Sequence, residues 1–189
     1  MEKYKLIYAD PPWQFSDKNT GGSYISGASN KYRTTGIEQL KQLDVQSIAD
    51  KDCLLVMWWV GAMPQEAIDL VNAWGFTIKN MNGFVWRKIT KKGKRYFGMG
   101  HYTRAGSESA IIAIKGKPKI HSHSVRAVQT KKILEHSVKP DLFRNLCVEM
   151  AGDVKRLEMF ARRSTNGWDL FGDQAPGSIN IPEKLKEVA

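Results

Sequence analysis

The sequence predicts an α/β protein whose mostly parallel sheet carries helices on both faces. Strand-like and helix-like segments alternate along the 189 residues. Residues 53–60 form a continuous apolar run, which is typical of a parallel strand covered on both sides. A chain of this length has room for one hydrophobic core, so we expect residues 1–189 to form a single domain.

The individual elements follow from apolar spacing and from breakers. Helices are expected over 37–48, after Pro64 and over 140–150. Pro64 is suited to a first helical turn, and Gly75 follows the last periodic residue of that helix. The helix over 140–150 should place Leu142, Leu146 and Met150 on one face. Strands are expected at 5–9, 53–60, 84–86, 110–114, 156–160 and 168–171.

Two stretches interrupt this alternation, namely residues 87–106 and 115–132. Both are rich in Lys and Arg, and both are predicted to be long loops. Loops of more than about 12–15 residues in a compact domain are usually functional or disordered.

The composition favours a protein that binds a polyanion inside a cell. Lys and Arg number 29 against 19 Asp and Glu, a net charge of +10, which suits nucleic acid. No apolar run approaches the roughly 20 residues that span a bilayer, and we expect neither a membrane segment nor a signal peptide. Cys53 and Cys147 lie in apolar segments and are expected to be buried free thiols, which fits a reducing location.

The tetrapeptide Asp10-Pro11-Pro12-Trp13 directly follows the first predicted strand, where open α/β sheets bind their ligands. An exocyclic amine needs an acceptor for each N–H if its lone pair is to attack. The Asp10 carboxylate and the Pro11 carbonyl can supply two, and Pro12 has no N–H that would compete. Asp10 would also stabilise the positive charge that develops on the nitrogen. Trp13 offers a flat face for stacking of a base.

These four residues alone leave the interpretation open. A rigid Pro-Pro turn after a strand, with Asp10 as a turn residue, explains them equally well.

Further motifs occur in order along the chain. Phe84-Val85-Trp86-Arg87-Lys88 is followed by Gly106-Ser107-Glu108 and a strand that ends in Lys115-Gly116. His136-Ser137-Val138-Lys139-Pro140 comes next, then Glu158-Met159-Phe160-Ala161-Arg162 and Gly172-Asp173-Gln174. Together with the tetrapeptide, these motifs resemble the messenger-RNA adenosine methyltransferase (MT-A) type family of S-adenosylmethionine-dependent N6-adenine methyltransferases, in particular its short bacterial and phage members.

The resemblance implies a Rossmann-like methyltransferase fold in permuted order, with the catalytic motif before the cofactor motif. It assigns catalysis to Asp10, Pro11, Pro12 and Trp13. It assigns S-adenosyl-L-methionine binding to Asp10, Lys139, Phe160, Arg162, Ser164, Thr165, Asp173 and Gln174. Lys139 matches the lysine that meets the cofactor carboxylate, and Arg162 is the expected ribose contact.

The resemblance also identifies residues 87–106 as the active-site loop. We expect this loop to hold the substrate strand, with phosphate contacts from its cations and stacking on its aromatic side chains. The residues concerned are Lys88, Lys91, Lys92, Lys94, Arg95, Tyr96, His101, Tyr102 and Arg104. No metal is expected, because His121 and His123 have no carboxylate or cysteine beside them at ligand spacing.

The sequence leaves the substrate and the assembly to be tested. DNA is favoured over RNA because the chain is as compact as the bacterial and phage members. A catalytically inactive relative that only binds nucleic acid or a partner is the alternative of another class. A homodimer and a location in the cytoplasm of a bacterial or phage-infected cell are further expectations.

Overall fold

The computed structural model describes residues 2–13, 36–98, 100, 102–133, 138–172 and 175–184. Within them, seven strands form one sheet in the order β5-β3-β4-β2-β1-β6-β7. The strands are β1 (Tyr4–Ala9), β2 (Ala49–Trp59), β3 (Thr77–Ile89), β4 (Ser107–Lys115), β5 (Val128–Lys132), β6 (Arg156–Met159) and β7 (Asp169–Phe171). The helices are α1 (Ile37–Gln42), α2 (Val45–Ile48), α3 (Pro64–Ala73) and α4 (Asp141–Ala151).

The sheet is mostly parallel, as the sequence predicts. β1 pairs in parallel with β2 and β6, β6 with β7, and β3 with β5. β4 alone runs antiparallel, to both β2 and β3. The C-terminal ends of the parallel strands therefore share one edge of the sheet with the beginning of β4. We call this edge the carboxyl edge.

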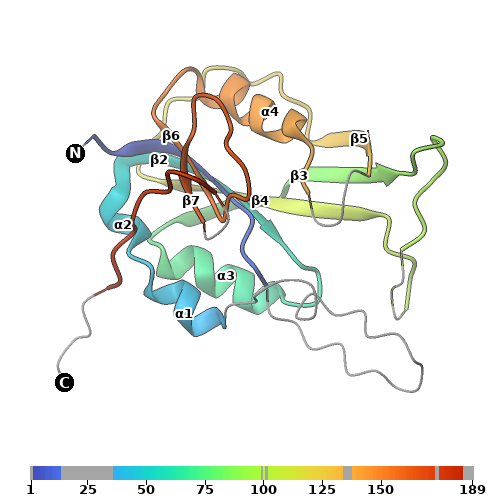
Figure 1. Ribbon diagram of the computed structural model, residues 1–189, viewed down its shortest axis with the longest axis horizontal. Helices are drawn as coiled ribbons and strands as arrows, with labels where there is room; N and C mark the ends of the chain where they lie inside the picture. The colour runs from blue at the N-terminus through green and yellow to red at the C-terminus, as the bar shows by residue number, and fades with distance from the viewer. Residues whose placement is uncertain are drawn as a thin grey trace.

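Helices cover both faces of the sheet, which confirms the predicted layers (Figure 1). α1 and α3 lie on one face, where Leu40, Leu70 and Val71 pack into a buried cluster with alternate residues of β1 and β2. α4 lies on the other face and buries Phe143 and Cys147. The central strand β1 is thereby covered on both sides, so its C-terminal end is held rigidly.

Several element predictions were wrong in detail. The helix expected over 37–48 is divided into α1 and α2, because Leu43 is extended and Asp44 caps α2 by accepting a hydrogen bond from the Ser47 N–H (3.2 Å). On α4 Phe143 and Cys147 are fully buried, and of the predicted face Met150 is buried while Leu142 and Leu146 are half-buried.

The two predicted loops contain strands. β3 is longer than the expected 84–86 and reaches Ile89, and the segment after it makes isolated bridges at Ile89–Arg95 and Gly98–Ala105. Residues 128–132, expected in a loop, form the edge strand β5. Four of its five side chains are exposed, so the apolar alternation that marks a half-buried strand is missing.

Candidate active site

Asp10 lies at the carboxyl edge, immediately after the central strand β1. Its backbone N–H donates to the Met159 carbonyl at the end of β6 (3.4 Å). The residue is therefore held between two parallel strands, and its side chain remains 25% exposed. This placement leaves the carboxylate accessible to a ligand above the edge.

Lys139 joins Asp10 to a second carboxylate. Its Nζ lies 2.9 and 2.8 Å from the two Asp10 carboxylate oxygens and 3.2 Å from Oε2 of Glu108, at the beginning of β4. Nζ also stands 5.3 Å from the centroid of the Trp58 ring. Lys88, from the end of β3, pairs with Glu108 on its other side. Two carboxylates and two ammonium groups thus balance in charge.

The electrostatics of this cluster keep Lys139 and Glu108 charged. Burial alone would lower the pKa of Lys139, but the Asp10 and Glu108 carboxylates outweigh it and raise that pKa above 10.5. Burial would raise the pKa of Glu108, and the ammonium groups of Lys139 and Lys88 lower it below 4.5. Lys139 is therefore a cation and Glu108 an anion throughout the neutral range.

The remainder of the tetrapeptide departs from the expected picture. The Trp13 N–H donates to the Pro11 carbonyl (2.9 Å), so one lone pair of that acceptor is in use although Pro12 itself offers no N–H. The Trp13 side chain is 7% exposed, and its Nε1 donates to the Trp58 carbonyl (3.1 Å). The prediction that Trp13 presents an open stacking face is wrong in this structure, because its indole is anchored in the core.

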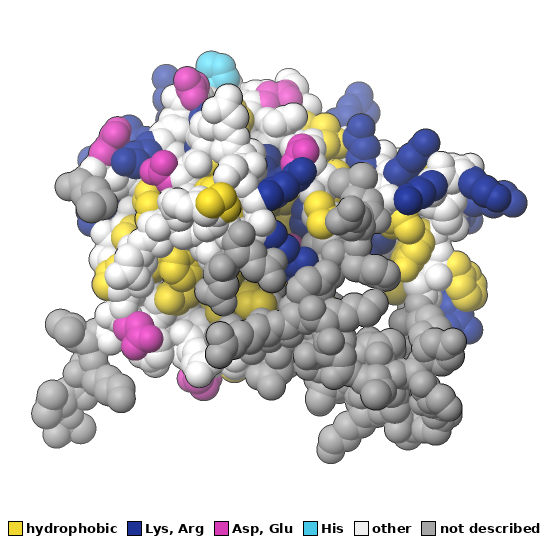
Figure 2. All heavy atoms as spheres, in the orientation of Figure 1, with side chains coloured by type: hydrophobic (Ala, Val, Ile, Leu, Met, Phe, Trp, Pro, Cys, Tyr) yellow, Lys and Arg dark blue, Asp and Glu magenta, His cyan; other side chains and the backbone are white. Residues whose placement is uncertain are grey.

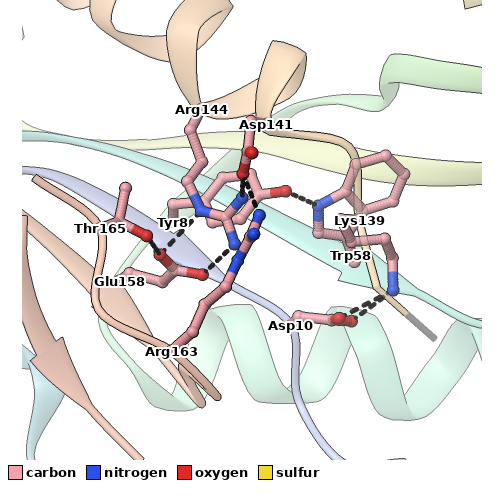
Figure 3. A network of polar contacts seen from close by, with 9 residues as sticks. All are labelled: Tyr8, Asp10, Trp58, Lys139, Asp141, Arg144, Glu158, Arg163 and Thr165. Carbon is pink, nitrogen blue, oxygen red and sulfur yellow. Dashed lines mark hydrogen bonds and ion pairs between the residues drawn. The ribbon is translucent and has the colours of Figure 1, made fainter. Parts of the chain in front are cut away.

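A second polar network lies beside Asp10 on the α4 face (Figure 3). Arg144 donates from Nε and Nη2 to the two carboxylate oxygens of Glu158, at 2.7 and 2.6 Å, and both side chains are 7% exposed. Asp141, at the start of α4, contacts both Arg144 (2.7 Å) and Arg163.

A pocket opens between these two networks. Charges of both signs and apolar surface line it together, from β1, β6 and the approach to α4. The lining residues are Tyr8, Asp10, Val138, Lys139, Arg144, Glu158, Phe160, Arg162 and Arg163. Below it, Tyr8 accepts a hydrogen bond from Nε1 of Trp58 (2.6 Å), and burial raises the pKa of its phenol. S-adenosylmethionine carries a carboxylate, an ammonium, a sulfonium and a ribose. The cations, carboxylates and apolar side chains that line the pocket match these parts of the cofactor in charge and polarity.

The structure brings several of the predicted cofactor residues to this pocket. Phe160 and Arg162 line it together with Asp10 and Lys139. Phe160 is a non-glycine residue with positive φ (63°), so the chain turns sharply as it leaves β6. Thr165 donates to Glu158 (3.2 Å), whereas Ser164 is exposed. Asp173 and Gln174 lie outside the described residues.

Of the predicted nucleic-acid residues that the structure describes, Lys88 lies at the end of β3 and the others lie in the connection between β3 and β4. Lys91, Lys92, Lys94 and Arg95 are exposed on its turn. The Lys88 ammonium lies 5.7 Å from the centroid of the Tyr96 ring, and the Arg104 guanidinium lies 4.8 Å from that of Phe97. Tyr102 is fully exposed. His101 lies outside the described residues.

Two residues of the site were missed from the sequence. Glu108 stands in the quoted Gly106-Ser107-Glu108 motif, and its position at the start of a strand was the available signal. Arg144 follows Lys139 by five residues, which places it one turn into α4, but nothing local indicates a partner fourteen residues away. In the part of the chain that the structure describes, no His, Cys, Asp and Glu group could hold a metal ion, and no helix is long and apolar enough to cross a membrane.

Comparison with known proteins gives consistent matches. The sequence model of the MT-A70 family matches residues 4–174. The chain is 35% identical over 199 residues to the Type II methyltransferase M.MunI of Mycoplasma sp, an alignment that covers 96% of this chain and 82% of the relative. It is 22% identical to the human N(6)-adenosine-methyltransferase catalytic subunit METTL3, over 94% of this chain and 29% of the relative. It is 24% identical to the human N(6)-adenine-specific methyltransferase METTL4, over 90% of this chain and 37% of the relative.

Proposed function

The chain belongs to the MT-A70 family of S-adenosylmethionine-dependent N6-adenine methyltransferases, and from that premise we propose that it methylates adenine in DNA. The observation that carries the proposal is the Asp10 carboxylate, held at the carboxyl edge beside a pocket of mixed charge. The relative named as a Type II methyltransferase is 35% identical, whereas the human relative named as an N(6)-adenosine-methyltransferase is 22% identical, and this difference supports DNA over RNA.

Asp10 is proposed to bind and orient the amino group of the target adenine. Lys139 occupies one position on each Asp10 oxygen, and a carboxylate has about four lone-pair sites, so acceptor capacity remains. The Pro11 carbonyl keeps one lone pair beyond its bond from the Trp13 N–H. Bound S-adenosylmethionine would supply a methyl group made electrophilic by the sulfonium. The Asp10 carboxylate would then stabilise positive charge on the amine nitrogen.

The cofactor is proposed to lie in the pocket between Asp10 and Glu158. Lys139 is assigned to its carboxylate, and Arg162 and Phe160 to its ribose side. The three contacts of Lys139 use all the N–H groups of an ammonium, so Lys139 must release one of them to bind that carboxylate. Ser164, Thr165, Asp173 and Gln174 remain assigned to the cofactor by the family resemblance.

The proposal extends to the organisation of the chain. We assign residues 1–189 to a single methyltransferase domain, with residues 87–106 as the loop that binds nucleic acid and 115–132 as a second basic segment. A homodimer in the bacterial cytoplasm is the proposed working form, and light scattering of the purified protein tests the dimer.

Transfer of labelled methyl groups to matched DNA and RNA oligonucleotides tests the activity and the polymer together. We expect N6-methyladenine in DNA, identified by mass spectrometry of the nucleosides. Asp10→Asn, which keeps the side chain's size and removes its charge, should lower transfer at least about 100-fold, the scale of losing one oriented electrostatic group. Transfer only to RNA would reject DNA as the substrate. If wild type and variant were equally inert on both polymers, the chain would be an inactive binding protein.

A further inference from the structure

The positive charge of the chain is concentrated in one stretch. Residues 87–132 contain thirteen Lys and Arg and a single acidic residue, Glu108. The remaining residues contain sixteen Lys and Arg against eighteen Asp and Glu, so the whole net charge of +10 comes from this stretch. Such separation of charge creates a local field far stronger than the net charge implies.

The structure places part of this charge on strand β5 at the carboxyl edge. β5 pairs in parallel with the end of β3, with Lys131 opposite Lys88 and Lys132 opposite Ile89. In Figure 2, Lys and Arg side chains gather over the end of the molecule where Figure 1 shows β3 and β5. Lys131, Lys132 and Arg87 are exposed, and within the described ranges their side chains form no hydrogen bond or ion pair. We call these three residues the β5 strip.

A rigid framework holds the β5 strip. Nε1 of Trp86 donates to the Lys131 carbonyl (3.0 Å), and the Trp86 side chain is 3% exposed. The Ile133 N–H donates to the Ile89 carbonyl (2.9 Å) just beyond the end of β5. These bonds fix the backbone of the two lysines, while their side chains keep their freedom in solvent.

A hollow beside the β5 strip adjoins the catalytic pocket. Ile89, Thr130, Lys131, Lys132 and Pro140 line it. Pro140 follows Lys139, which lines the catalytic pocket and bonds Asp10. Because Lys139 and Pro140 are consecutive, the hollow lies near the pocket proposed for the cofactor and near Asp10, where the target base is proposed to lie.

We propose that the β5 strip binds the phosphate backbone of the substrate DNA next to the target adenine, in addition to the contacts assigned to residues 88–106. This inference rests on the proposed function, because it requires nucleic acid as the substrate. The DNA strand would cross the carboxyl edge of the sheet from β5 toward β1. Its phosphates would meet the cations at β5, and its target base would lie at the anionic Asp10. Phosphate contacts position a polymer without reading its sequence, so the strip sets register rather than specificity.

The competing explanation is that Lys131 and Lys132 protect an edge strand. β5 has neighbour β3 on one side only, and lysines on such strands prevent pairing with another chain. The two explanations predict different salt dependence of DNA binding, because only phosphate contacts release counterions.

The experiment compares two double variants with the same loss of charge. Lys131→Gln/Lys132→Gln removes the two lysines of the β5 strip and leaves Arg87, and Lys117→Gln/Lys119→Gln removes two exposed lysines just after β4 ends, at the opposite edge of the sheet. Binding of the full-length proteins to a fluorescent DNA duplex of about 20 base pairs is measured between 50 and 200 mM KCl. Loss of two phosphate contacts should reduce the slope of log affinity against log salt by about 1.8 in the first variant. The slope of the second should equal that of wild type.

The outcomes test the role of the β5 strip separately from the methyltransferase assignment. Equal slopes for the strip variant and wild type, with a folded monodisperse variant, would overturn the role of the β5 strip and leave the methyltransferase assignment intact. Equal reductions in both double variants would also overturn it, because the effect would then be one of net charge. Wild type that binds neither DNA nor RNA would instead reject nucleic acid as the substrate.

Discussion

Replacing Arg144 by Met should destabilise the protein through the carboxylate that it leaves behind. Arg144 makes two short hydrogen bonds to Glu158 from a site where both side chains are 7% exposed. Met preserves much of the volume of the arginine stem and removes the guanidinium. Among the described residues, Glu158 would then keep the 3.2 Å hydrogen bond from Thr165.

The magnitude follows from the cost of an unpaired buried charge. Removing one partner of a buried pair costs about 3–5 kcal/mol. Each kcal/mol lowers the melting temperature of a chain of this size by about 2–4 °C. We therefore expect the melting temperature of Arg144→Met to fall by about 6–20 °C. Cofactor binding should weaken as well, because both residues line the pocket proposed to hold the cofactor.

Urea unfolding and calorimetry of three variants test this reasoning. Glu38→Gln is the control, because it breaks an ion pair with Lys41 in which the Glu38 side chain is 75% exposed, and it should cost less than about 1 kcal/mol. Arg144→Met/Glu158→Gln removes both charges and should recover part of the stability. If Arg144→Met were no less stable than Glu38→Gln, or if the double variant were less stable than Arg144→Met by the full cost of a second independent loss, the argument would fail.

Two further predictions concern the loop and the Glu108 cluster. Changing Lys91, Lys92, Lys94 and Arg95 together to Ala should weaken DNA binding and flatten its salt dependence, and an unchanged slope in a binding titration would show that the loop is only solvated. Because the folded pKa of Glu108 lies below its ordinary value, this carboxylate stabilises the fold above pH 4.5 and loses that effect as the pH falls further. The difference in unfolding free energy between wild type and Glu108→Gln should therefore be larger at pH 7 than at pH 4, and a difference that does not change with pH would contradict the assigned pairing with Lys139 and Lys88.

Local sequence patterns predicted correctly the features that depend on a single strand or helix. The run at 53–60 predicted a strand covered on both faces, and Pro64 and Gly75 predicted the limits of α3. Asp10 directly follows the first strand, and this position predicted that it lies at the carboxyl edge, because the end of a strand can be read from the neighbouring residues.

Local sequence patterns did not predict the features that depend on contact with a residue distant in the sequence. β5 has no apolar alternation, and it is a strand only because the end of β3 offers a free edge to pair with. Trp13 looked like a stacking face, but β2 supplies the Trp58 carbonyl that holds its indole in the core.

The sequence by itself determined the α/β class, the basic character and the residues that resemble a methyltransferase motif. Apolar periodicity, charge and the order of the motifs are all properties of the linear sequence. Only the tertiary structure decided how those residues are charged and paired. Asp10, Glu108 and Lys139 are up to 129 positions apart, and they form one cluster because parallel strands end at the same edge while the antiparallel β4 begins there. The strength of such contacts depends on burial and distance, and both are set by the packing of the sheet.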